Sequence, residues 1–142
     1  MAIRRMFSLN VIDTDKFLEM PISSQTLYFH LGMRADDEGF VSSPKKIAMV
    51  CNCSTDDLKI LASKGYIIPF QDGVIVITHW MENNQIRKDR FHDTKYQEEK
   101  KTLFLSDGVY CLAPSERVGN RLATDWQPNG NQMETEVWLG KD

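Results

Sequence analysis

The alternation of apolar and polar positions divides the first 35 residues into three short elements. Residues 7–11 alternate strictly, which is the period of a half-buried strand or an extended arm. Asp13 or Thr14 is placed to cap a short helix, and Pro21 ends it after Met20. The side chains of this helix that we expect to point inward are Phe17 and Leu18.

A longer helix is predicted from Gln25 to Ala35, with Ser23 or Ser24 as its cap. Its apolar stripe follows helical spacing, so it is expected to be the central helix of the core, through Leu27, Tyr28, Leu31 and Ala35. The acidic residues 36–39 that follow are interpreted as a solvated polar turn, and residues 40–41 as a very short strand.

Two further helices and a hairpin are predicted next. Ser43 is expected to cap a helix that has Pro44 at its first position, and Ser54 to cap a second helix that stops at Gly65. The expected inward residues are Ile47, Ala48 and Cys51 in the first and Leu58, Leu61 and Ala62 in the second. Two β-branched runs flanking Asp72-Gly73 then predict a β-hairpin over 66–78, with Pro69 on an edge strand or at a bulge.

This order of elements predicts an α+β protein built on a winged helix-turn-helix with a β-hairpin wing. The pattern after Thr94, which includes Tyr96, Leu103 and Phe104, predicts an additional C-terminal helix, closed by residues 106–108. Residues 1–105 are therefore expected to form one folded domain and residues 106–142, with Trp126, a weakly ordered tail.

Composition sets limits on the class of protein. With 142 residues, 42% apolar and 26% charged, the chain suits a single globular domain. It contains no apolar run of the roughly 18 residues that a membrane span needs. Three cysteines are too few for a disulfide framework, and an odd number cannot all pair with one another. We therefore expect reduced thiols and a cytoplasmic location.

The formal net charge of -3 speaks against a nucleic-acid partner only if the charge is evenly spread. It is not, because residues 1–105 carry 14 Lys or Arg and 14 Asp or Glu, whereas residues 106–142 carry 3 and 6. We interpret residues 106–142 as an acidic linker or tail, of the kind that leads to a further C-terminal domain. The neutral body leaves room for a local basic patch.

A segment rich in cations, amides and aromatic residues follows the hairpin, over residues 81–96. Its arginines and lysines are suited to phosphates, and its amides and aromatic rings to bases. An equally open interpretation is a solvated segment whose cations pair with Asp89 and Asp93 while Trp80, Ile86 and Tyr96 pack against the body.

Three stretches of the chain are similar to a known family, the N-terminal domain of phage replisome organisers. The stretches are residues 3–8 (IRRMFS), residues 21–41, which end in GMRADDEGFV, and residues 86–90 (IRKDR) with Thr94 and Tyr96. These replication-initiation proteins belong to phages of Gram-positive bacteria and resemble DnaD-type primosome proteins. The resemblance implies a winged helix that binds origin DNA, self-associates and helps to deliver the host helicase through its loader.

The candidate DNA-binding residues follow from this interpretation. One patch is expected on two adjacent helices, from Lys45, Lys46, Lys59 and Lys64, and further contacts to the DNA backbone from Arg87, Lys88 and Arg90. Asp56 and Asp57 fit poorly, because they occupy the first turn of the candidate recognition helix and would repel phosphates.

Two alternatives keep the fold and change the function. In one, the domain is an oligomerisation or partner-docking module that uses the Asp56-Asp57 turn and the apolar edge of the hairpin. In the other, it is a transcriptional regulator. We expect no enzyme, cofactor or metal, since the chain has no Walker-type phosphate loop and Cys51 and Cys53 are too closely spaced for a typical zinc site.

Overall fold

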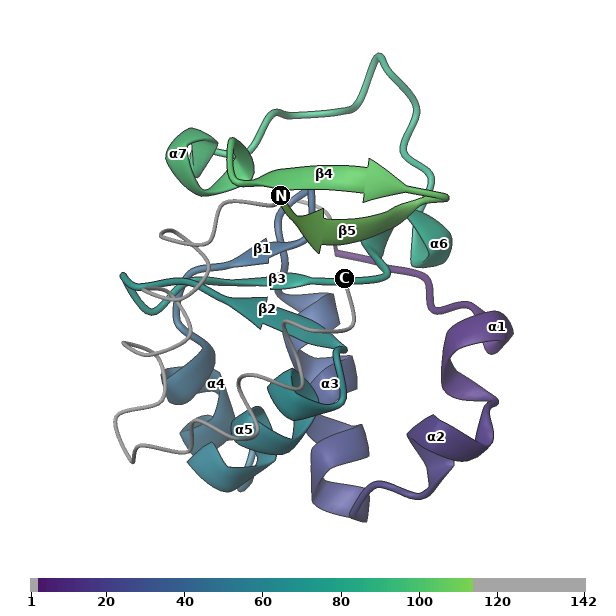
Figure 1. Cartoon of the computed structure of the whole chain (residues 1–142), viewed down its shortest axis with the longest axis vertical. Helices are drawn as coiled ribbons and strands as arrows, with labels where there is room; N and C mark the ends of the chain where they lie inside the picture. The colour runs from purple at the N-terminus through teal and green to yellow at the C-terminus, as the bar shows by residue number, and fades with distance from the viewer. Residues whose placement is uncertain (1–2, 114–142) are drawn as a thin grey trace.

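A small antiparallel sheet separates a helical side of the molecule from a side made of loops and a second hairpin (Figure 1). The computed structural model describes residues 3–113, so Trp126 and nearly all of the predicted tail lie outside the described residues. The predicted α+β class is confirmed. The elements are α1 (Leu9–Ile12), α2 (Asp15–Leu18), α3 (Ile22–Met33), β1 (Phe40–Val41), α4 (Pro44–Val50), α5 (Thr55–Ser63), β2 (Ile67–Pro69), β3 (Ile75–Ile77), α6 (Trp80–Asn83), α7 (Gln97–Lys100), β4 (Leu103–Ser106) and β5 (Val109–Leu112).

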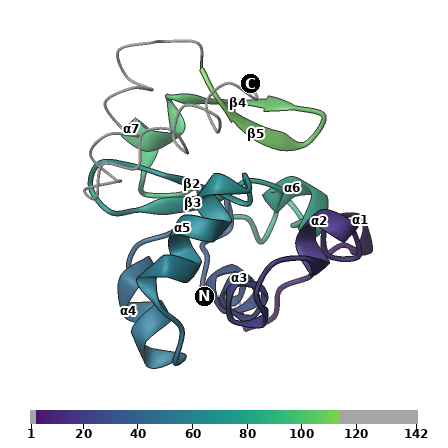
Figure 2. The same ribbon diagram turned by 60° about the horizontal axis from the view of Figure 1, so that its bottom comes forward.

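Helices α3, α4 and α5 pack against one another on one side of the sheet (Figures 1 and 2). All four residues of the predicted stripe are fully buried, but α3 ends at Met33, so Ala35 lies just beyond it. The predicted caps of this helix are wrong, because α3 begins at Ile22 after Pro21. The hydroxyls of Ser23 and Ser24 instead donate to the carboxylate of Asp57 on α5.

The start of α5 is confirmed in detail. Ser54 accepts a hydrogen bond from the amide of Asp57, and Asp57 accepts one from the amide of Ser54, which is a capping box. Asn52, at φ 61°, makes the break between α4 and α5, and Gly65, at φ 84°, follows the last turn of α5. The inward residues predicted for α5 are all buried.

The predicted hairpin is confirmed as β2 and β3, which pair around Ile68 and Val76. β1 pairs with the other side of β3, so the order is β1-β3-β2 and Pro69 lies on an edge strand, as predicted. The hairpin has no exposed apolar edge, because the residues of both strands are buried. Helices cover one face of the sheet, and the β4–β5 hairpin and α7 lie over the other (Figure 1).

The C-terminal helix predicted after Thr94 is wrong beyond its first turn. α7 has only four residues, and Leu103 and Phe104 belong to β4, which pairs with β5. Asp107 and Gly108 have φ of 53° and 79°, the left-handed pair that a tight hairpin turn requires. Because Tyr110 and Leu112 are buried in the core, the folded part extends past residue 105.

Residues 4–8 form an extended arm rather than a paired strand, and α1 begins directly after Ser8. Two asparagines at the end of α6 hold the arm in place. The Asn83 side chain accepts from the amide of Ser8, and the Asn84 side chain both accepts from the amide of Met6 and donates to its carbonyl. α2 begins after Thr14 as predicted, but Leu18 is 54% exposed and does not point inward.

The acidic turn at residues 36–39 is not solvated, contrary to the prediction. Glu38 is 2% exposed and forms an ion pair with Lys100, with 2.7 Å between Oε1 and Nζ. Asp36 accepts hydrogen bonds from the amide of Phe40 and the hydroxyl of Thr94. The turn therefore joins the helical side of the sheet to the segment that follows α6.

No helix within residues 3–113 combines the length and the apolar character needed to cross a membrane.

Candidate functional site

Four of the predicted DNA-binding residues lie on the helical side of the sheet. Lys45 and Lys46 are exposed in the first turn of α4, Lys59 is partly exposed on α5, and Lys64 is the exposed C-cap of α5. α4 and α5 pack against each other, and we call the parts of the two helices that carry these four residues the lysine surface. None of the four has a carboxylate partner within 4 Å among the described residues.

The side chain of Asp57 points into the molecule rather than outward from this surface. Its side chain is 5% exposed and accepts hydrogen bonds from three serine hydroxyls and one backbone amide. Burial alone would raise the pKa of Asp57, but the bonds from Ser54, Ser23 and Ser24 outweigh it and lower the pKa. Asp56 remains the exposed acid at this helix end.

The three remaining predicted residues lie on the other side of the sheet. Arg87, Lys88 and Arg90 are exposed in the loop that follows α6, whereas α4 and α5 lie beneath the sheet (Figure 1). The structure therefore divides the seven predicted cations between two surfaces. Of the ion pairs expected within this loop, Arg87 pairs with Asp89 at 3.2 Å, and both side chains are largely exposed.

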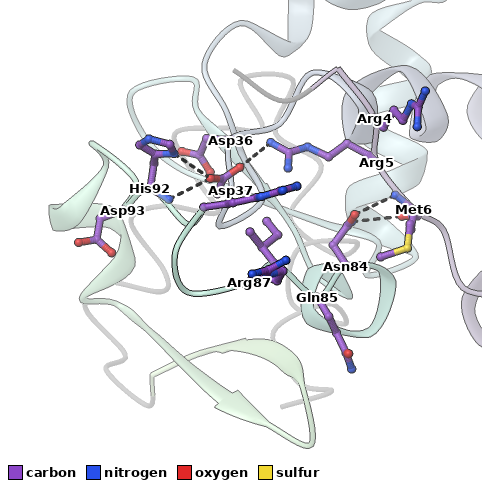
Figure 3. Close-up of a pocket in the computed structure, with 12 residues that line it drawn as sticks. Arg4, Arg5, Met6, Asp36, Asp37, Asn84, Gln85, Arg87, His92 and Asp93 are labelled. Carbon is purple, nitrogen blue, oxygen red and sulfur yellow. Dashed lines mark hydrogen bonds and ion pairs between the residues drawn. The ribbon is translucent and has the colours of Figure 1, made fainter.

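A cleft opens between the extended arm and this loop, with a volume of about 910 Å³ (Figure 3). We call it the arginine cleft. Side chains of the arm lie along one wall and side chains of the loop along the other. Its lining residues are Arg4, Arg5, Met6, Asp36, Asp37, Asn84, Gln85, Ile86, Arg87, Arg90, His92 and Asp93.

The floor of the arginine cleft holds a buried ion pair that joins the arm to the acidic turn. Arg5 Nη2 lies 3.0 Å from Asp37 Oδ1, and the two side chains are 4% and 12% exposed. The same guanidinium donates to the carbonyl of Ala35 and lies 5.2 Å from the centre of the Trp80 ring. Sequence reasoning missed Arg5 as a structural residue, because its partner is 32 positions away in the chain.

Asp37 is held as a carboxylate by partners from two segments. Burial alone would raise its pKa, but the backbone amide of His92 and the guanidinium of Arg5 both donate to it and lower the pKa below its ordinary range. The charge of Arg5 is thus balanced within the floor. The exposed cations at the rim are therefore the ones available to a ligand.

The rim carries two exposed guanidinium groups from the loop, those of Arg87 and Arg90, whereas the side chain of Arg4 on the arm points away from Arg87 and from the Arg5–Asp37 pair (Figure 3). The amide of Arg90 donates to the carbonyl of Arg87 at 2.9 Å, so these two residues are the ends of one turn, with Cα atoms within about 7 Å. Arg4 and Arg90 have no carboxylate partner within 4 Å among the described residues. Arg4 belongs to a motif used for the family resemblance, but nothing in its spacing indicated a cleft.

Within residues 3–113, no three His, Cys, Asp or Glu side chains lie close enough together to hold a metal ion. Cys51 and Cys53 are partly exposed free thiols. Burial raises the pKa of Cys53, which disfavours the thiolate that a metal would need.

No family model matches the chain, and no curated protein or solved structure is significantly similar to it. The likeness to phage replisome organisers therefore stays a prediction.

Proposed function

We propose that the chain is a DNA-binding module and that the segment from α3 to β3 is a winged helix with α5 as its recognition helix. As the resemblance implies, we place this activity at the initiation of phage DNA replication in the host cytoplasm. The module would bind origin DNA, self-associate and help to deliver the host helicase through its loader.

The lysine surface is the single observation that carries the proposal. Residues 44–65 hold four lysines and two aspartates, a formal net charge of +2, in a chain whose net charge is -3. The Asp57 carboxylate is turned inward and accepts four hydrogen bonds, so of the two aspartates only Asp56 presents its carboxylate at the surface. The helix order α3, α4, α5 followed by a hairpin is the arrangement that carries a helix to the major groove.

The test is a titration of a fluorescent origin-derived duplex, followed by anisotropy at several salt concentrations. Four lysine–phosphate contacts give an expected slope of log K against log salt of about -3.6. Lys45→Gln/Lys46→Gln should reduce the slope by about 1.8 and weaken binding at low salt at least tenfold.

The matched control is Lys95→Gln/Lys101→Gln, which removes two exposed lysines from the opposite side of the sheet. Its duplex affinity should stay within about twofold of the wild type. Salt-independent binding, or equal loss in both double variants, contradicts a DNA surface on α4 and α5.

Self-association without DNA contact is a second candidate function, favoured by one observation. Met49 and Val50, at the end of α4, are 76% and 67% exposed. If this apolar pair is a contact between copies, Met49→Ser/Val50→Ser should shift the molar mass measured by light scattering toward the monomer, and the wild type should show no salt-dependent binding of the duplex. Loss of duplex binding with an unchanged molar mass would favour the DNA-binding function instead.

A further inference from the structure

We propose that the arginine cleft is a second, separate binding site, and that it takes the sugar–phosphate backbone of single-stranded DNA. The site lies on the opposite side of the sheet from the lysine surface, so it stands or fails independently of the duplex contact proposed above.

The chemistry of the rim selects a phosphate ligand. Arg87 and Arg90 bring two guanidinium groups to one cleft, and such a group is a planar fork that matches two phosphate oxygens. Among the ion pairs of residues 3–113, the only carboxylate paired with either arginine is that of Asp89. The Asp89 side chain is 60% exposed, so a phosphate can replace it at little cost. Asp93 and Asp36 also line the cleft, but the hydroxyl of Thr94 and the amide of Phe40 already donate to Asp36.

The walls of the cleft are fixed by contacts below the rim. The Arg5–Asp37 pair ties the arm to the acidic turn, and the amide of His92 donates to the other oxygen of Asp37 at 2.9 Å. Asn84 holds the backbone of Met6 through two hydrogen bonds, of 2.8 and 3.1 Å. These contacts set the positions of Arg4 and of the loop before any ligand arrives, which reduces the entropy lost on binding.

The remaining lining residues favour a nucleotide strand over a bare phosphate ion. Met6 and Ile86 offer apolar surface, and the exposed amide of Gln85 is able to donate to and accept from a base edge. The rim is open, with the arginines and His92 exposed, whereas pockets for free nucleotides enclose most of the ligand. An open cleft with spaced cations suits an extended strand that enters and leaves it.

The experiment measures the anisotropy of a labelled oligothymidylate of about 15 nucleotides, titrated with the whole chain at several salt concentrations. The test variant is Arg87→Gln/Arg90→Gln, and the matched control is Lys95→Gln/Lys101→Gln, which removes the same charge from the same side of the sheet but outside the cleft. Circular dichroism checks that each variant is folded. The two arginines are exposed, so we expect no loss of structure.

We expect the test variant to bind the strand at least about tenfold more weakly at low salt and with a salt slope smaller by about 1.4, and the control to change by less than about twofold. Equal weakening in both double variants would mean a diffuse charge effect and overturn the site. Displacement of the strand by inorganic phosphate or ATP at the same phosphate concentration would show a free-phosphate site and overturn the assignment to a strand.

A second pair of measurements separates this site from the lysine surface. Lys45→Gln/Lys46→Gln should retain strand binding, and Arg87→Gln/Arg90→Gln should retain duplex binding. If the arginine variant loses duplex and strand together, the cleft is part of a duplex surface and the present inference fails. If strand binding depends on the arginines but duplex binding does not depend on the lysines, the inference holds and the proposed duplex function fails.

Discussion

Replacing Asp57 by alanine tests the contact that joins α3 to α5. The carboxylate is 5% exposed, and one of its oxygens accepts from Ser23 and Ser24, at 2.8 Å each. The other oxygen accepts from the amide of Ser54 at 3.0 Å and completes the capping box. The substitution removes all of these acceptors at once.

The expected loss in the free energy of unfolding is about 3 kcal/mol. Ser24 is fully buried, so its hydroxyl would lose its acceptor away from water, at a cost of about 2 kcal/mol. Loss of the reciprocal cap at Ser54 adds about 1 kcal/mol. With a denaturant slope of about 2 kcal/mol per molar urea, the unfolding midpoint measured by circular dichroism should fall by about 1.5 M.

Asp56→Ala is the matched control, because this neighbouring carboxylate is exposed. Its effect on the free energy of unfolding should stay within about 0.5 kcal/mol. A loss below about 1 kcal/mol for Asp57→Ala, or equal losses in both variants, would refute the role given to the buried carboxylate.

The same contact makes a pH-dependent contribution with a definite sign. The hydrogen bonds lower the pKa of Asp57 in the folded state relative to the unfolded chain, where it is about 3.9. The stability that Asp57 supplies is therefore fully present above about pH 4 and is lost as the pH falls through the lower, folded-state pKa. The difference in unfolding midpoint between the wild type and Asp57→Ala should be constant near neutral pH and shrink only in acid.

Two further predictions concern packing. Gly39→Ala places a Cβ atom 2.7 Å from Trp80, at a φ of 93° that disfavours alanine. The free energy of unfolding, measured in urea, should fall by about 3 kcal/mol. A loss under about 1 kcal/mol would contradict this close approach. A chain cut to residues 1–105 loses the buried Tyr110. Its free energy of unfolding should be lower by at least about 4 kcal/mol than that of a chain cut to residues 1–113. Equal thermal midpoints of the two chains would contradict the packing of β5 on the core.

Local rules predicted the parts of the fold whose partners are close in the chain. The capping box at Ser54 spans three residues, and the hairpin around Asp72-Gly73 is a local turn motif, so both were accessible to sequence reasoning. The β4–β5 hairpin was missed although it carries the same motif. Asp107-Gly108 lies between two apolar runs, but the helical spacing of the residues just before it favoured the wrong element.

The candidate site was less accessible, because its architecture depends on contacts between distant segments. Asp37 contacts Arg5 and also His92, which lies 55 positions later in the chain. No local sequence pattern indicates that these segments come together. An acidic run is usually solvated, so the burial of Glu38 was not expected. Seven cations were recognised individually, but their division between two surfaces and the places of Arg4 and Arg5 in the cleft required the fold.

The attachment of the extended arm has a consequence for the order in which the molecule is completed. The arm leaves the ribosome before the side chains that hold it, because Asn83 and Asn84 follow 75 to 78 residues later. At about 5–20 residues per second, several seconds pass before these partners are made. During that interval the wall that carries Arg4 is not in place, so the arginine cleft is assembled only after the helices, the sheet and α6 have been synthesised.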